Sequence, residues 1–311
     1  MKQSRPLNLY SKLRSQRDEN KSALSVRREY PGGNLKLTLI KFRQIFRLSM
    51  AIISLLLSAF AAASDSRLVL TGSSTVAPLA LEIAKRYEKL HPGVRIDVQT
   101  GGSSRGINDT RRGLADIGMV SRALKSTEQD LNSYSIAMDG ICIILHNSNP
   151  VNVLSDQQLI DIYRGRIRNW NEVGGPDLAI TVVNKAEGRS TLELFLHHFQ
   201  LKNSQIKAHV VIGDNQQGIK TVAGNPGAIA YVSIGTAEFE EEQGSTIKRL
   251  PMSGNAATIT NVRDGVFPLS RPLNLVIKGK PSLIEIDFIH FSQSESVNDL
   301  IEGQFFVPPK L

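Results

Sequence analysis

A single cysteine, Cys142, occurs among the 311 residues, so no disulfide can form within the chain. Cys142 lies inside an apolar run and is predicted to be a small buried hydrophobic residue. Patterns of several enzyme classes are also missing. The six histidines show no H-E-x-x-H spacing, and neither G-x-S-x-G nor G-x-x-x-x-G-K-[ST] occurs. We therefore expect no metal, no cofactor and no nucleotide hydrolysis.

An excess of positive charge is confined to one part of the chain. The formal net charge of +8 would by itself suggest a nucleic-acid-binding protein. Residues 1–63 hold 12 of the 37 basic and 3 of the 29 acidic residues, so residues 64–311 hold 25 and 26 and carry a net charge of −1. The basic excess belongs to the leader, and no nucleic-acid partner is expected.

The leader has the organisation of a secretory signal peptide. Three cations, Lys41, Arg43 and Arg47, precede an uncharged apolar run at 48–60, and three alanines at 61–63 form a small-residue cleavage site. The run is shorter than the roughly 20 residues of a typical spanning helix, and a membrane anchor is the alternative. No cysteine follows the run, which argues against a lipoprotein.

The first part of this leader, residues 1–40, is polar, basic and long for the n-region of a signal peptide. They indicate either a translation start assigned too far upstream or an unusually long signal. Without the basic leader and signal peptide, 1–63, a mature chain of residues 64–311 remains, which is long enough for two lobes. An exported chain without disulfides suits the bacterial periplasm, so we expect a periplasmic location.

The mature chain is organised around the stretch Leu68–Leu81, which reads LVLTGSSTVAPLAL. Its first residues predict a buried strand, a Gly/Ser turn begins at Gly72, and helical spacing follows Pro78. A helix N-terminus has unpaired N–H groups and partial positive charge, so a small anion can bind there, and Ser and Thr hydroxyls add donors. An ordinary serine N-cap is the alternative.

Two further strands end in similar turns. Val94–Thr100 alternates as a strand and leads into a turn at Gly101–Gly106 and a short helix at Ile107–Gly113, whereas the strand Asp116–Val120 ends at Ser121. Strands that alternate with helices predict an α/β fold with a largely parallel sheet, in which ligands bind beyond the carboxyl ends of the strands. Three hydroxyl-rich turns at equivalent positions therefore predict one polar ligand site.

A second lobe is predicted beyond Pro150. Asp139 and a glycine precede an apolar strand at Ile141–Leu145, and the chain then crosses over. The strand Ala179–Val183 leads into a polar turn, Asn184–Thr191, before another helix. The second lobe would thus repeat the strand, polar turn and helix of the first.

The turns supply many hydrogen-bond donors and few acceptors. Besides N–H groups and hydroxyls, they carry the cations Arg105, Arg122, Lys185 and Arg189. Such a set suits a small tetrahedral oxyanion, whose oxygens accept hydrogen bonds. A solvated surface charge, the usual state of Lys and Arg, is the alternative for each cation.

Several motifs occur in order over nearly the whole mature chain. They are TGSSTVAPL at 71–79, GGSSRGI at 101–107, ADIGMVSR at 115–122, DG at 139–140, LIDIYRGRIRNWNEVGG at 159–175, GAIAYV at 227–232 and FVPP at 306–309. In this combination the sequence resembles the periplasmic phosphate-binding proteins of bacterial ABC phosphate importers. One such motif is weak, whereas the ordered set is specific.

The resemblance implies an α/β, two-lobed periplasmic-binding-protein (Venus-flytrap) fold, with a mixed, mostly parallel sheet in each lobe and the ligand in the cleft between the lobes. Lobe 1 would comprise residues 64–144 and 230–311, and lobe 2 residues 145–229. The resemblance further implies a monomeric, non-enzymatic receptor. It would bind inorganic phosphate and deliver it to the membrane subunits of an ABC permease by lobe closure.

The resemblance also implies which residues contact phosphate. Its motifs assign this role to Ser74, Thr75, Ser103 and Thr191. The turns of this chain add Ser121, Asp139, Arg189 and Ser190, with Arg122 and Lys185 as further candidates. No residue is expected to be catalytic or to bind a metal.

The chain departs from the family's pattern at several of these positions. Lys185 stands where many members have an arginine, so Arg189, in a turn that often reads Gly-Ser-Gly-Thr, is expected to supply the planar fork that lysine lacks. Glu187 is placed to pair with one of the two. Ser121 stands where some members have an aspartate, whose carboxylate would accept the proton of HPO₄²⁻ and repel sulfate. Asp139 is the candidate replacement, and a turn-forming aspartate is the alternative.

Other functions stay open. A serine at position 121 is compatible with a receptor for another oxyanion, such as sulfate, molybdate or tungstate. A secreted phosphatase with Ser74 as its nucleophile would belong to a different class, and it would need a nearby base and an orienting acid. A phosphate-sensing or adhesion role on the same fold is a third possibility.

Overall fold

The computed structural model describes residue 50 and residues 66–309. The predicted signal peptide and its cleavage site lie outside the described residues, apart from Met50. Residues 66–309 belong to one compact unit. Among the described residues, no helix combines the length and the apolar character needed to span a bilayer.

The first strands and helices alternate as predicted. They are β1 (Ser66–Gly72), α2 (Ala77–Leu90), β2 (Val94–Thr100), α3 (Ser103–Arg111) and β3 (Ile117–Val120). Pro78 lies in the first turn of α2, as expected. The next helix begins at Ser103 and not at Ile107, because Gly102 adopts φ 94°, a conformation open mainly to glycine, and turns the chain directly into the helix. The hydroxyl of Ser103 thereby lies in the first helical turn.

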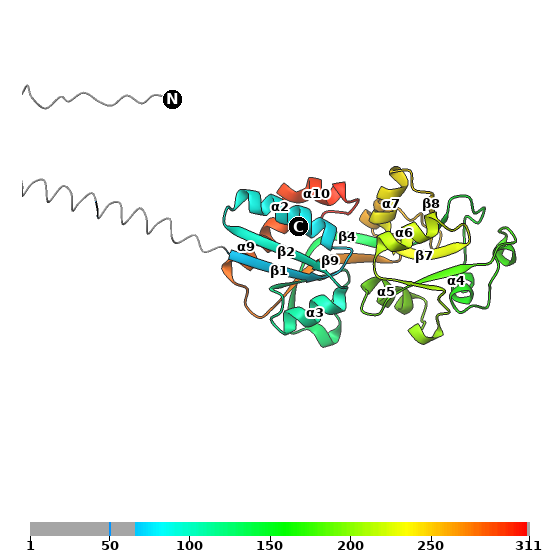
Figure 1. The fold of residues 1–311 in the computed structure, drawn as a ribbon, viewed down its shortest axis with the longest axis horizontal. Helices are drawn as coiled ribbons and strands as arrows, with labels where there is room; N and C mark the ends of the chain where they lie inside the picture. The colour runs from blue at the N-terminus through cyan, green and yellow to red at the C-terminus, as the bar shows by residue number, and fades with distance from the viewer. Residues whose placement is uncertain (1–49, 51–65, 310–311) are drawn as a thin grey trace, which may run out of the picture. The chain divides into compact units, whose positions relative to one another are not determined.

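The central strands are β4 (Leu131–His146), β7 (Ala228–Ser233), β8 (Ile247–Leu250) and β9 (Ser270–Lys278). β4 is a single strand of 16 residues. Its residues 131–140 pair with β9, whereas residues 141–146 pair with β7 and β8. The apolar run Ile141–Leu145, predicted as a strand of its own, is the second half of this longer strand. Figure 1 shows β4 and β9 lying between the two groups of helices.

The other elements are α4 (Asp156–Tyr163), β5 (Thr181–Lys185), α5 (Ser190–His198), β6 (Val210–Ile212), α6 (Asn215–Ala223), α7 (Ile234–Glu242), α8 (Ile259–Arg263), α9 (Leu283–Gln293) and α10 (Asn298–Gly303). The strand order is β2-β1-β3-β9-β4-β7-β5-β6, with β8 paired to β4. The sheet is mixed, as predicted. β1 and β5 pair in parallel with their neighbours, but every pairing that β4 or β9 makes is antiparallel. The parallel part is therefore smaller than expected, because the two strands that pass between the lobes run against their neighbours.

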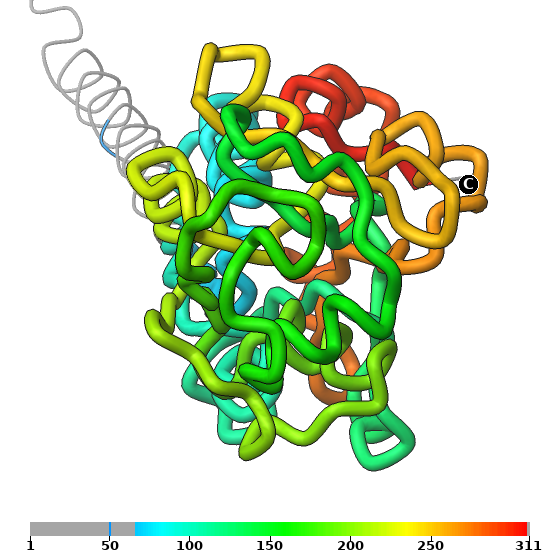
Figure 2. Tube along the Cα trace, turned by 90° about the vertical axis from the view of Figure 1, so that its right-hand side faces the viewer, coloured from blue at the N-terminus to red at the C-terminus, as the bar shows by residue number. Residues whose placement is uncertain are grey.

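Two large hydrophobic cores lie along β4, beside a small third cluster that includes Leu131. The first is formed by β1, α2, β9 and α9, and the second by α4, β5, α5 and β7. Ile136 belongs to the first core and Ile141 to the second, together with Cys142, which is fully buried as predicted. Figure 2 shows the molecule from the side of this second core, with the green and yellow segments nearest the viewer.

The two cores give a natural division into lobes. The second core includes apolar side chains from Ala228 through Leu269, and the chain re-enters the first core in β9. On this grouping we propose that lobe 1 comprises residues 66–140 and 270–309, and lobe 2 residues 141–269. The return would then occur near residue 270 and not near residue 230, because residues 230–269 bury their apolar side chains in the second core.

Candidate anion-binding site

Arg271 and Asp139 form a fully buried ion pair where β9 and β4 pass between the lobes. The two residues face each other directly in the strand register, and their side chains are 1% and 0% exposed. Arg271 Nε and Nη2 donate to Asp139 Oδ2 at 3.1 and 2.8 Å. The other carboxylate oxygen, Oδ1, accepts from the N–H of Gly235 at 3.2 Å. The carboxylate thus orients the guanidinium and is itself held on both oxygens.

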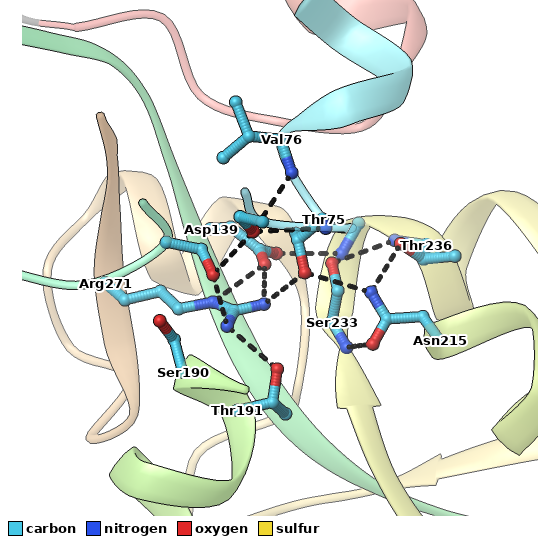
Figure 3. Close-up of polar contacts among 12 residues, drawn as sticks. Thr75, Val76, Asp139, Ser190, Thr191, Asn215, Ser233, Thr236 and Arg271 are labelled. Carbon is cyan, nitrogen blue, oxygen red and sulfur yellow. Dashed lines mark hydrogen bonds and ion pairs between the residues drawn. The ribbon is translucent and has the colours of Figure 1, made fainter. Parts of the chain in front are cut away.

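The guanidinium of Arg271 also donates to three hydroxyl groups. The distances are 3.3 Å from Nη2 to Thr75 Oγ1, 3.4 Å from Nη1 to Ser121 Oγ and 3.1 Å from Nη1 to Thr191 Oγ1. Thr75 precedes α2 and Ser121 follows β3, both in lobe 1, whereas Thr191 lies in the first turn of α5 in lobe 2. Figure 3 shows the guanidinium between Thr75, Asp139 and Thr191. Hydroxyls from both lobes therefore meet at one cation.

A second contact between the lobes lies beside the first. Ser190 Oγ donates to Ser103 Oγ at 2.5 Å, and Ser103 Oγ accepts from the N–H of Ser121 at 3.2 Å. A Cβ on Gly102 would lie 2.6 Å from the carbonyl oxygen of Gly188, so only glycine permits this close approach. The N-termini of α3 and α5 face each other here, and their partial positive charges favour an anion.

A buried lysine supports the site from the side of lobe 2. Lys185 Nζ donates to the backbone oxygen of Asp214 at 2.7 Å and to Asn215 Oδ1 at 3.0 Å. Asn215 Nδ2 donates to Thr75 Oγ1 at 3.2 Å, again across the lobes. Burial lowers the pKa of Lys185 to about 7. Asp214 opposes this shift, and the positive charges of Arg271 and Arg189 add to it.

Arg189 stands at the start of α5 between glycines of both lobes. Its Cδ lies 2.9 Å from the position of a Cβ on Gly102, and its Nη2 lies 3.4 Å from that of a Cβ on Gly213. Its Nε is buried and has no hydrogen-bond partner within the part of the chain that the structure describes. The expected pairing with Glu187 is not found, since the carboxylate of Glu187 accepts from Asn203 at 2.9 Å.

Six of the predicted site residues come together in this network: Thr75, Ser103, Ser121, Asp139, Ser190 and Thr191. Ser74 differs from its neighbours. It is half-buried, makes no side-chain hydrogen bond among residues 66–309, and lines an adjoining cavity of about 450 Å³. The turn that precedes α2 is instead held by Ser73, whose Oγ accepts from the N–H groups of Thr75 and Val76 at 3.2 and 3.4 Å.

Arg122 is a further candidate ligand from the sequence, and its guanidinium lies among carboxylates. Its guanidinium pairs with Glu128 at 2.7 and 2.9 Å, and its Nε lies 2.8 Å from Glu193 Oε2. Because two carboxylates neutralise this charge, we propose that Arg122 is a structural cation. Arg105 is exposed and bonds to Asp109.

Sequence reasoning missed Arg271 and Asn215. One signal could have pointed to Arg271. It directly precedes Pro272 and the apolar strand Leu273–Lys278, where burying a charged side chain costs free energy unless the charge is paired. Its partner, Asp139, lies more than a hundred residues earlier, so only the sheet register brings the two together. In residues 66–309, no group of three or more His, Cys, Asp or Glu residues is arranged to hold a metal ion.

The fold and the buried polar cluster between its lobes define the class of two-lobed solute-binding proteins. A family model, described as a PBP superfamily domain, matches residues 58–296. The phosphate-binding protein PstS of Bacillus subtilis is 25% identical over 250 residues, which are 79% of this chain and 81% of that protein. The chain belongs to the PBP superfamily, within which it is a relative of the PstS phosphate-binding proteins.

Solved structures agree with this assignment. A phosphate ABC transporter substrate-binding protein of Clostridium perfringens with bound phosphate is 31% identical, with a TM-score of 0.73, over 79% of this chain and 100% of that one. An ABC-type phosphate transport receptor of Vibrio cholerae is 30% identical, with a TM-score of 0.66, over 78% of this chain and 100% of that one. The two-lobed α/β fold predicted from the motifs is thereby confirmed.

Proposed function

We propose that this protein is an exported, non-enzymatic receptor that captures inorganic phosphate in the cleft and delivers it to the membrane subunits of an ABC permease. The observation that carries the proposal is the meeting of hydroxyls from both lobes at one buried guanidinium. Thr75 and Ser121 come from lobe 1, Thr191 comes from lobe 2, and all three contact Arg271.

The arrangement suits a small tetrahedral dianion for physical reasons. Helix N-termini and hydroxyls donate without having to be charged. The five N–H groups of Arg271 are donated to Asp139 and to three hydroxyls, so Arg271 contributes positive charge and orients the hydroxyls. Inside a closed cleft the local dielectric is low, so each bond to the anion is stronger than it would be in water. Because donors come from both lobes, an anion would favour the closed state over the open one.

The contacts of Asp139 favour a role different from the one predicted for it. Both of its oxygens accept hydrogen bonds from the protein, two from Arg271 and one from Gly235, and its side chain is fully buried. We propose that Asp139 orients Arg271 and does not itself receive the phosphate proton.

Calorimetric titration of the purified protein with phosphate tests the proposal. We expect saturable one-to-one binding, weakened at least tenfold by Thr75→Val or Thr191→Val, because each substitution removes a hydroxyl from the site. Thr246→Val is the matched control, since the Thr246 hydroxyl donates to the carbonyl oxygen of Ala223 and lies outside the polar cluster. Absence of phosphate binding in the wild-type protein would refute the proposal.

Two rival functions are separated by simple additions to this experiment. Tighter binding of sulfate, molybdate or tungstate than of phosphate would identify a receptor for another oxyanion. Turnover of a chromogenic phosphate ester, abolished by Ser74→Ala, would identify a phosphatase. We expect neither result. Purified protein is expected to sediment as a monomer, and exported protein should be recovered from the periplasmic fraction.

A further inference from the structure

The hydroxyl groups of the polar cluster around Arg271 differ in which of their bonding positions the protein already fills. A hydroxyl can donate one hydrogen and accept at two positions. Where protein donors fill both acceptor positions, only the hydrogen is left for a ligand. Where the hydrogen is already donated to the protein, only acceptor positions are left. The contacts around Arg271 allow this assignment residue by residue.

Ser121 is held as a donor. Its Oγ accepts from Ser73 Oγ at 2.9 Å and from Arg271 Nη1 at 3.4 Å. The direction of the first bond follows from Ser73, whose own oxygen accepts from the N–H groups of Thr75 and Val76 and so has only its hydrogen to give. With both acceptor positions filled, Ser121 has only its hydrogen to offer a ligand.

Thr75 is held as a donor in the same way. Its Oγ1 accepts from Arg271 Nη2 at 3.3 Å and from Asn215 Nδ2 at 3.2 Å. The amide of Asn215 cannot be turned around, because its Oδ1 accepts from Lys185 Nζ at 3.0 Å and from the N–H of Ser233 at 3.4 Å. Lys185 therefore acts through Asn215 to leave the Thr75 hydrogen free.

Ser103 and Ser190 form the remaining pair. Ser103 Oγ accepts from the N–H of Ser121 at 3.2 Å and from the Ser190 hydroxyl at 2.5 Å, so it too has only its hydrogen to offer. Ser190 is the reverse. Its hydrogen is given to Ser103, and no residue between 66 and 309 donates to its oxygen. Figure 3 shows Ser190 beside the side chain of Arg271, next to Thr191.

This pattern of donating and accepting hydroxyls matches the hydrogen-bonding groups of HPO₄²⁻. HPO₄²⁻ has three oxygens that only accept and one hydroxyl that donates, whereas sulfate only accepts. The cluster holds three hydroxyls restricted to donating and one, Ser190, restricted to accepting, whereas Thr191 accepts one bond from Arg271 and keeps its hydrogen. We propose that Ser190 accepts the proton of HPO₄²⁻ and is the residue that distinguishes protonated oxyanions from sulfate. The inference rests on the proposed function and adds to it the residue that sets specificity.

The test compares three anions on four forms of the protein. Phosphate and arsenate carry a proton near neutral pH and sulfate does not. The ratio of the sulfate to the phosphate dissociation constant therefore measures how much the proton of the anion contributes to affinity. The forms are the wild type, Ser190→Ala, Ser190→Thr and Thr191→Val. Calorimetry gives the dissociation constants, and displacement of bound phosphate gives that of sulfate where its binding is weak.

We expect Ser190→Ala to weaken phosphate and arsenate about tenfold or more, because their proton would be buried without an acceptor, and to leave sulfate nearly unchanged. Ser190→Thr keeps the oxygen and should restore the wild-type ratio. Thr191→Val should weaken all three anions together. Equal weakening of the three anions by Ser190→Ala, or no loss of phosphate affinity, would overturn the assignment. Absence of binding of all three by the wild type would instead refute the proposed function.

Discussion

Two buried arginines, Arg122 and Arg271, both link lobe 1 to lobe 2, and they differ in what neutralises them. Arg122 meets two carboxylates, those of Glu128 and Glu193, and Glu193 also pairs with Lys125 at 2.8 Å. Arg271 meets one carboxylate, that of Asp139, and three hydroxyls. The first cluster is balanced by its own residues.

The second cluster has an uncompensated positive charge. Its three cations are Arg271, Lys185 and Arg189, and the two carboxylates that act on them are Asp139, in contact with the guanidinium, and Asp214, near Lys185. A buried charge is costly unless it is paired, so a cluster with excess positive charge between helix N-termini is suited to an anion from outside. We propose that the same kind of side chain is a structural link in one place and part of a binding site in the other, and that the number of carboxylates around it decides which.

The largest effect on binding should come from removing the charged pair at the centre of the site. Arg271→Gln combined with Asp139→Asn avoids leaving a lone buried carboxylate. We expect calorimetry to show phosphate affinity reduced by a factor on the order of 100 or more, since the central positive charge and the orientation of three hydroxyls are lost. Arg105→Gln, which changes an exposed arginine paired with Asp109, is the control. Unchanged affinity in the double variant would contradict the central role of Arg271.

The corresponding change at the balanced cluster should affect stability. Arg122→Met leaves Glu128 buried without its partner, which should lower the free energy of unfolding by about 3–5 kcal/mol. Urea denaturation measures this, and adding Glu128→Gln should recover part of the loss. Phosphate affinity of the folded variant should stay within about fivefold of the wild type. A hundredfold loss of affinity in this variant would abolish the distinction between the two clusters.

Lys185 should make anion binding depend on pH. Burial lowers its pKa to about 7, and a bound dianion would favour the charged ammonium, so binding above pH 7 takes up a proton. Sulfate keeps its charge in this range, and we expect its affinity to fall about tenfold between pH 7 and 9. Titration of Lys185→Met should give a flat profile. An equally steep fall in that variant would assign the dependence to another group.

The same pKa shift has a consequence for folding. The unfolded chain keeps the Lys185 proton up to the ordinary value of 10.5, so between about pH 7 and 10.5 the unfolded state binds more protons than the folded state. The contribution of this lysine to stability therefore rises with pH across that window. Below pH 7 the full cost of burying the charge is present.

The smallest effect should come from the link between the lobes at Glu193. Glu193→Gln weakens the pairs with Arg122 and Lys125, which should weaken closure by about 1 kcal/mol and reduce the affinities for phosphate and sulfate equally, by about fivefold. Glu187→Gln changes an exposed carboxylate in the preceding turn and is the control. A change in the ratio of the two affinities would show that Glu193 acts on the ligand and not on closure.

Local sequence determined the elements of the binding site. The Gly/Ser turns after β1 and β2, with hydroxyls at Thr75 and Ser103, are short-range patterns in which turn residues and helical spacing adjoin. The ordered motifs indicated the fold as well, because they are shared with proteins of known architecture. For the same reason the turn of the second lobe, with Ser190 and Thr191, could be predicted from the sequence alone.

Only the tertiary structure decided which charges take part. Arg271 and Asp139 are adjacent because β4 and β9 pair in one register, and Arg122 is neutralised because Glu193 approaches from the other lobe. Such pairings join residues far apart in the chain, and the sequence around either residue does not predict its partner. The donor and acceptor roles of the hydroxyls likewise depend on contacts made across the cleft. Local propensity forms the turns, and long-range packing selects the cation that they surround.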